Sequence, residues 1–112
     1  MNNKDYITRY LSWCKNERGL SNNTLIAYKT NLNTVLKHTD KLLHELTVTD
    51  IRALLNEIAD TKTKHVRNYV YNVLKNYYQY LIDVEEIIVT NPMLKIAKIK
   101  EDHKERRSLS TS

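Results

Sequence analysis

The side chains best placed for chemistry in this sequence are cations gathered at the start of an expected helix. Residues 62–67 read KTKHVR, which puts Lys62, Lys64, His65 and Arg67 within about one helical turn. Cations are unfavourable at a helix N-terminus, because exposed N–H groups and the helix dipole make that end partly positive. A phosphate would offset this repulsion and accept hydrogen bonds from the same N–H groups. The cluster is therefore interpreted either as a phosphate site or as a solvated charged face.

A second expected helix start also lacks the acidic residue that usually occupies it. Residues 21–36 read SNNTLIAYKTNLNTVL, with Ser21, Asn23 and Thr24 at the start and Lys29 on the next turn. Ser21 is a good N-cap, and these polar side chains could also donate hydrogen bonds to a phosphate backbone. By contrast, the helix expected from residue 48 carries an aspartate in its first turn. Two helix starts are thus predicted to be open to an anion, and a third is closed by its own carboxylate.

The other reactive side chains do not form an active site. The 4 histidines and the single Cys14 share no spacing typical of metal ligands, so we expect no metal and no cofactor. Gly19 is the only glycine, which excludes a glycine-rich phosphate loop. None of the 8 tyrosines stands beside a cluster of Arg, His and Lys that would activate it as a nucleophile. The adjacent carboxylates Glu85 and Glu86 are interpreted as solvated.

Composition places the chain among small soluble domains with an anionic partner. With 112 residues, 41% hydrophobic and 28% charged, it is long enough for one domain with a moderate core. No apolar run reaches the length of about 18 residues that a membrane span needs. A single cysteine fits a reducing cytosol, so we expect a cytoplasmic protein. The net charge of +5 and pI near 9.3 favour nucleic acid as the partner.

Apolar periodicity predicts four helices and no strands, so the expected fold is an all-α antiparallel four-helix bundle. The expected helices cover about residues 4–18, 21–36, 48–59 and 63–84. In the longest helix Tyr69 belongs to the expected buried stripe, whereas Tyr78 and Tyr80 fall off it and are expected to be partly exposed.

Local signals mark the helix ends. Gly19 is expected at the C′ position of the first helix, and Ser21 caps the second. Thr47 and Asp50 form a capping-box pattern at the third helix. Asn91-Pro92 predicts a turn after the fourth.

The order of these motifs resembles the N-terminal core-binding domain of tyrosine recombinases, in the phage integrase and chromosome-dimer resolution group. The family pattern is a Leu-Ser-x-x-Thr-x-x-x-Tyr helix, an Ile-containing third helix, a fourth helix with an early Arg and a late Tyr-x-x-Leu, and an Asn-Pro. In this sequence the matching residues are Leu20, Ser21, Thr24, Tyr28, Ile51, Arg67, Tyr78, Leu81, Asn91 and Pro92. The resemblance covers about residues 4–100.

The resemblance implies a SAM-like domain that forms a clamp around double-stranded DNA together with a C-terminal catalytic domain. Residues 1–94 would be the core-binding domain and residues 95–112 a basic interdomain linker. The family's catalytic Arg, Lys, His and Tyr belong to the second domain, which we expect this fragment to lack, so it should bind DNA and not be an enzyme. The implied DNA contacts are Ser21, Asn23, Thr24, Tyr28, Lys29, Lys62, Lys64, His65, Arg67, Lys95, Lys98 and Lys100.

The partners implied by the resemblance are double-stranded DNA, the catalytic domain of the same parent chain and other recombinase protomers on DNA, without a membrane. Two other interpretations remain open. A helical protein-interaction or oligomerisation module would show a large exposed apolar patch. A helix-turn-helix regulator is less well supported, because no short helix pair is joined by a glycine-containing turn of three or four residues.

Overall fold

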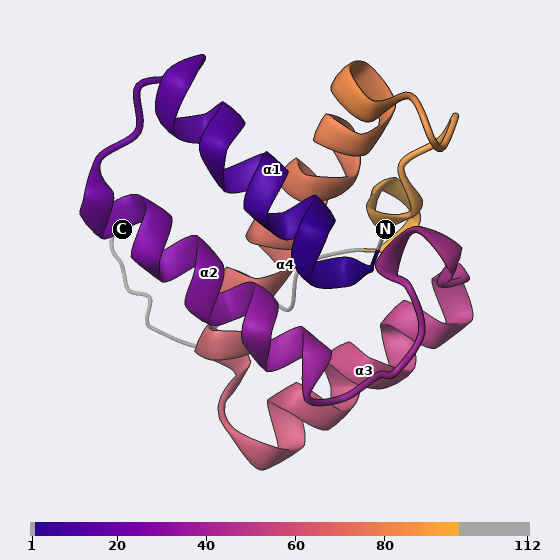
Figure 1. The fold of residues 1–112 in the computed structure, drawn as a ribbon. Coiled ribbons are helices and arrows are strands. Elements are labelled where there is room, and N and C mark those ends of the chain that lie inside the picture. The colour runs from indigo at the N-terminus through magenta and orange to yellow at the C-terminus, as the bar shows by residue number, and fades with distance from the viewer. Residues whose placement is uncertain (1, 97–112) are drawn as a thin grey trace, which may run out of the picture.

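The structure is a computed structural model that describes residues 2–96, and all the regular structure in these residues is helical (Figure 1). The α-helices are α1 (Asn3–Asn16), α2 (Asn22–Leu36), α3 (Val48–Thr61) and α4 (Lys64–Tyr80). The shorter helices are η1 (Leu43–Glu45), the π-helix η2 (Leu81–Glu85) and η3 (Pro92–Lys95). The prediction of an all-α domain with four main helices is confirmed.

Helices α2, α3 and α4 each begin at an N-cap with a hydroxyl side chain. Ser21 and Thr47 are the caps that the sequence predicts, and Thr63 is a third, at the predicted start of its helix. Ser21 accepts a hydrogen bond from the backbone N–H of Thr24 at 3.3 Å, and Thr63 caps α4 in the same way. Thr47 and Asp50 form the predicted capping box, in which each side chain accepts from the other residue's backbone N–H. The hydrogen bonds from Thr47 hold the pKa of Asp50 below its usual range.

The turn between α1 and α2 depends on Gly19. Its φ of 65° lies in the left-handed region, which a residue with a side chain adopts only at a cost. The C-cap of α1 is Glu17, so Gly19 lies one residue beyond the predicted C′ position. The turn reverses the chain, and Figure 1 shows α2 returning antiparallel beside α1.

Helix α4 is the central element of the core. It packs against α2, α3, η2 and η3, and in Figure 1 it passes behind the α1–α2 pair. Fully buried side chains come from every α-helix and from η3, including Tyr10, Leu32, Ile58, Leu74 and Met93. The core therefore extends past α4 to the short helix after Asn91-Pro92, and Ile96 is also buried.

The predictions of which tyrosines on α4 are buried and which are exposed were wrong for three of them. Tyr78 and Tyr80 are only 1% and 3% exposed, whereas Tyr69 is 52% exposed. The Tyr78 hydroxyl donates to the carbonyl oxygen of Leu43 at 2.6 Å, and the Tyr80 ring lies 5.2 Å from that of Trp13. One apolar stripe along a helix is the pattern expected when a single face of the helix is covered. Helix α4 has neighbours on several sides, so more of its circumference is buried.

A three-residue clasp joins α1 to the segment after α4. The Arg9 guanidinium donates to both carboxylate oxygens of Glu85, from Nε at 2.6 Å and from Nη2 at 3.1 Å. The Tyr80 hydroxyl donates to the same carboxylate. The Glu85 side chain is only 8% exposed, so the interpretation of Glu85 as solvated was wrong, although Glu86 is exposed. The Arg9 hydrogen bonds lower the pKa of Glu85.

Replacing Glu85 with Gln is expected to lower the free energy of unfolding at pH 7 by about 1 kcal/mol, because one charged hydrogen-bond acceptor is lost beside a half-exposed Arg9. A carboxyl whose pKa is lower in the folded than in the unfolded state stabilises the fold above its unfolded pKa. That contribution disappears as the pH falls through the folded pKa. The difference between wild type and variant should therefore shrink from about pH 5 downward, as measured by urea unfolding at several pH values. A difference that is constant with pH would contradict this role for Glu85.

Candidate nucleic-acid interface

The start of α4 has the cationic character that the sequence indicates. Lys62, Lys64 and His65 are exposed around the N-cap Thr63, and the first turn holds no acidic residue. The N–H groups of a first helical turn point out of the helix end, where no intrahelical acceptor exists. Ammonium groups and backbone donors thus meet at one helix end, which is the donor set that a phosphate binds.

The start of α2 provides neutral donors. Ser21 and Asn23 are exposed and Thr24 is half-buried. The hydroxyl oxygens of Ser21 and Thr24 lie 3.1 Å apart, and no acidic residue is in the first turn. In the view of Figure 1 the first residues of α2 and of α4 both lie on the left of the molecule. The start of α2 can therefore offer hydroxyl and amide donors to an anion, without a charge of its own.

Two of the predicted contact residues have structural surroundings. Arg67 is 5% exposed, its guanidinium lies 5.8 Å from the centroid of the Tyr71 ring, and it donates to the Asn68 side chain at 3.3 Å. Burial lowers the pKa of Arg67. Tyr28 is half-buried, and its ring stacks on Tyr10 with the planes 5° apart. Arg67 is therefore buried inside the domain, and Tyr28 packs on the core while keeping part of its surface exposed.

The structure separates the remaining predicted lysines. Lys29 lies on the flank of α2 that faces α1, in a groove it shares with Lys4. Lys95 is exposed at the end of η3, and its carbonyl oxygen accepts a hydrogen bond from Arg52 at 2.9 Å. Lys98 and Lys100 lie outside the described residues. Among the predicted lysines, Lys62 and Lys64 are therefore the ones that lie together, at the start of α4.

The segregation of charge in this chain extends beyond the two helix starts predicted from the sequence. Residues 18–39 and 61–82, which include all of α2 and α4, contain no Asp or Glu. The acidic residues of the other two α-helices are Asp5 in α1 and Asp50, Glu57 and Asp60 in α3. Counting acids along whole helices, rather than in their first turns alone, would have found this signal. Two helices without a repulsive carboxylate suit a polyanion better than two open helix ends alone.

The outer face of α4 was also missed. His65, Tyr69, Asn72 and Asn76 are exposed and follow one another at the spacing of a single helix face. The His65 and Tyr69 rings meet edge to face with their centroids 4.6 Å apart. This face combines flat rings with amide side chains, which can each donate and accept a hydrogen bond.

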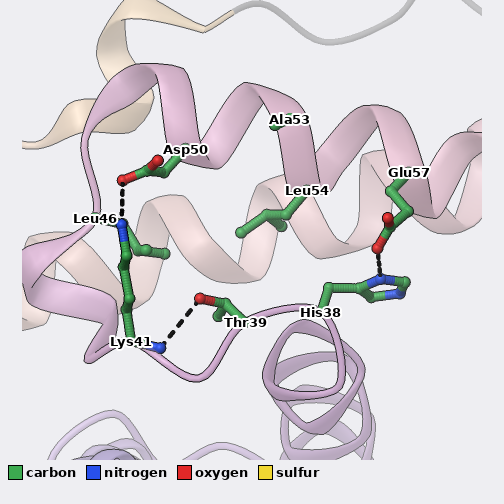
Figure 2. A pocket seen from close by; sticks show the side chains of 8 residues that line it. All are labelled: His38, Thr39, Lys41, Leu46, Asp50, Ala53, Leu54 and Glu57. Carbon is green, nitrogen blue, oxygen red and sulfur yellow. Dashed lines mark hydrogen bonds and ion pairs between the residues drawn. The ribbon is translucent and has the colours of Figure 1, made fainter.

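A small polar pocket between the α2–α3 connection and α3 offers no comparable site. It has a volume of about 200 Å³, and Figure 2 shows His38 paired with Glu57 and Lys41 with Asp50 across it. Each of these carboxylates already has a partner inside the pocket, so neither is left to bind a ligand. Within residues 2–96, no cluster of three metal-ligating side chains occurs, and no helix is both long and apolar enough to cross a bilayer.

The fold and its acid-free helices define the class of protein: a small all-α domain in which α2 and α4 carry no carboxylate. The chain belongs to the family of the phage integrase N-terminal SAM-like domain, whose family model matches residues 7–85. The resemblance to the tyrosine recombinase core-binding domain is thereby confirmed. No curated protein matches the chain.

Solved structures of lambda integrase share the fold. The lambda integrase (75–356) dimer bound to a COC′ core site has a TM-score of 0.78 and 25% identity, over 96% of this chain and 38% of that one. A lambda integrase dimer on the same core site gives 0.78 and 25%, over 96% and 30%. A lambda integrase tetramer bound to a Holliday junction gives 0.78 and 21%, over 96% and 32%, and supports the fold alone. The chain spans about a third of the length of these integrase chains.

Proposed function

We propose that this chain is the DNA-binding clamp domain of a site-specific tyrosine recombinase, and that it holds the recombination site for a C-terminal catalytic domain. The observation that carries the proposal is the absence of carboxylates from α2 and α4, combined with cations at the start of α4. Membership of the integrase family supports it, as do the lambda integrase structures solved with core-site DNA. The surface matches a polyanion in charge and in donor type.

The helix starts are the proposed phosphate contacts. Lys62 and Lys64 would neutralise phosphates beside the N–H groups of α4, and the His65 ring would add a further N–H donor. Ser21, Asn23 and Thr24 would donate neutral hydrogen bonds from α2, which position the domain without reading sequence. The start of α4 carries charged donors and the start of α2 carries neutral ones. Only the charged contacts should therefore contribute to the salt dependence of DNA binding.

The exposed amides of α4 are the proposed base readers. Asn72 and Asn76 lie on the outer face, one helical turn apart. An α-helix fits the DNA major groove, and Asn can hydrogen bond to both N6 and N7 of adenine there. With phosphates held at the start of α4, the next turns of this helix would lie along the groove.

The other predicted contacts take flanking or supporting roles in the proposal. Lys29, Lys95, Lys98 and Lys100 would follow the DNA backbone outside the helix starts. Arg67 and Tyr28 would act indirectly, because their packing fixes the first turns of α4 and α2. Residues 95–112 would lead as a linker toward the catalytic domain.

Strand cleavage is assigned in this proposal to the catalytic domain and not to residues of this chain. Burial raises the pKa values of Tyr10, Tyr77, Tyr78 and Tyr80, which disfavours the phenolate that a nucleophile needs. The partners would be duplex DNA, the catalytic domain of the same parent chain and other recombinase protomers, in the cytoplasm.

A titration of a fluorescein-labelled mixed-sequence duplex of about 30 base pairs tests the proposal, with anisotropy as the measurement. We expect saturable binding at about 50 mM salt that weakens linearly on a plot of log K against log salt, because bound lysines displace condensed counterions. A chain that leaves the anisotropy unchanged at low salt, up to protein concentrations of about 100 µM, would contradict DNA binding by this domain.

A further inference from the structure

Three lysines surround a groove between α1 and α2. Lys4 comes from α1, Lys29 and Lys37 come from α2, and the groove has a volume of about 580 Å³. Ile7 and Leu11 contribute apolar surface inside it, and no acidic side chain lines it. The groove thus combines an apolar floor with an unbalanced cationic rim, which suits an apolar segment bearing carboxylates.

A segment with the complementary character follows α4 in the same chain. Residues 83–89 read DVEEIIV, with Asp83 and Glu86 exposed. The apolar side chains of Val84, Ile87 and Val89 are 42%, 37% and 91% exposed. This segment therefore presents carboxylates and β-branched apolar groups together, the chemistry that the lysine-rimmed groove lacks.

The segment cannot reach the groove of its own molecule. Glu85 is bound to Arg9 of α1 at 2.6 Å, which fixes the segment on the Arg9 flank of that helix. Arg9 follows Lys4 by five residues, so it projects about 140° away from Lys4 around the helix. The groove and the segment therefore lie on different flanks of α1, and this segment can fill such a groove only in another copy of the chain.

We propose that residues 83–89 of one copy of this chain dock in the α1–α2 groove of a second copy. Asp83 and Glu86 would face the lysines, and the exposed valines and isoleucine would cover Ile7 and Leu11. The two surfaces differ, so the contact is heterologous and each copy can both give and accept a segment. The contact needs no DNA, and it goes beyond the DNA-binding function proposed above.

Sedimentation velocity without DNA at about 50 mM salt, with protein up to about 1 mM, tests this contact. The groove variant carries Lys4→Gln and Lys37→Gln, and the segment variant carries Asp83→Asn and Glu86→Gln. Wild type is expected to self-associate with increasing concentration, and each variant alone to do so at least tenfold more weakly. An equimolar mixture should form a complex that stops at 1:1, because the groove variant keeps its segment and the segment variant keeps its groove.

A double variant at the start of α4, Lys62→Gln with Lys64→Gln, is the matched control. It removes the same charge as the groove variant and is expected to self-associate like wild type. The proposal is overturned if wild type stays monomeric over the whole range, if the groove variant associates as strongly as wild type, or if the mixture gives no complex. Because no DNA is present, failure here leaves the DNA titration as a separate test.

Discussion

Replacing Lys62 and Lys64 together with Gln is expected to weaken binding to duplex DNA roughly hundredfold at about 50 mM salt. Each lysine that neutralises a phosphate releases nearly one counterion, and at low salt that release favours binding by roughly tenfold per contact. The slope of log K against log salt should therefore fall by about 1.8. The measurement is the anisotropy titration, repeated at several salt concentrations.

The same double variant should leave stability nearly unchanged. Lys64 lies in the first turn of α4, where a cation costs a few tenths of a kcal/mol, whereas Lys62 is the C-cap of α3, where a cation is stabilising by a similar amount. The melting temperature of the variant is therefore expected to match that of wild type. Loss of DNA binding with retained stability would come from the interface and not from unfolding.

A control with the same change in net charge tests whether the effect is local. Lys15 and Lys41 are exposed, Lys15 near the end of α1 and Lys41 beside Asp50, at 3.7 Å from its carboxylate. Replacing both with Gln should weaken DNA binding by less than about threefold. Equal losses in the two double variants would mean that net charge, rather than the start of α4, governs binding.

The features that sequence predicts well in this chain are local ones. The capping box of Thr47 and Asp50 needs only residues three apart, and the cap at Ser21 is equally local. The single glycine of the chain marks the turn after the first helix, one residue beyond the predicted C′ position. Helix ends follow from such short-range hydrogen bonds, so their pattern survives without knowledge of the tertiary fold.

The errors arise where burial depends on distant residues. Tyr78 is buried because it reaches Leu43, and Tyr80 because the rings of Tyr10 and Trp13 pack on it. Glu85 is drawn out of solvent by Arg9, 76 residues earlier in the chain. Periodicity reports which side of a helix is apolar, but it does not report how many neighbours that helix has.

The positive charge of the candidate site could be predicted from the sequence, but the positions of several of its side chains could not. Cations around Thr63 were visible in sequence, whereas the burial of Arg67 over Tyr71 and the position of Lys29 beside α1 depend on packing. The family resemblance implied one group of DNA contacts that includes these lysines and Arg67. The structure instead divides them among a helix end, the domain interior and a separate groove.

The second large effect is expected in the core, where Tyr78→Phe should lower the free energy of unfolding by about 1.5 kcal/mol. The Tyr78 hydroxyl donates to the Leu43 carbonyl at 2.6 Å, in surroundings that are fully buried. The carbonyl also accepts from the Leu46 backbone N–H at 3.3 Å, so it keeps one partner and the loss stays moderate. Urea unfolding followed by circular dichroism measures the change, provided that the m-value is the same as in wild type.

Tyr77 is the matched control, because it is adjacent, equally buried and chemically identical. Within residues 2–96 its hydroxyl has no hydrogen-bond partner, so it keeps only the desolvation cost of a buried polar group. Tyr77→Phe should therefore leave the free energy of unfolding unchanged or raise it by up to about 1 kcal/mol, while its ring keeps the edge contact with Tyr10. Burial raises the pKa of both phenols, so neither ionises near neutral pH and both variants remove a neutral hydroxyl. Similar losses in the two variants would mean that ring packing and not the Leu43 hydrogen bond sets the contribution of Tyr78.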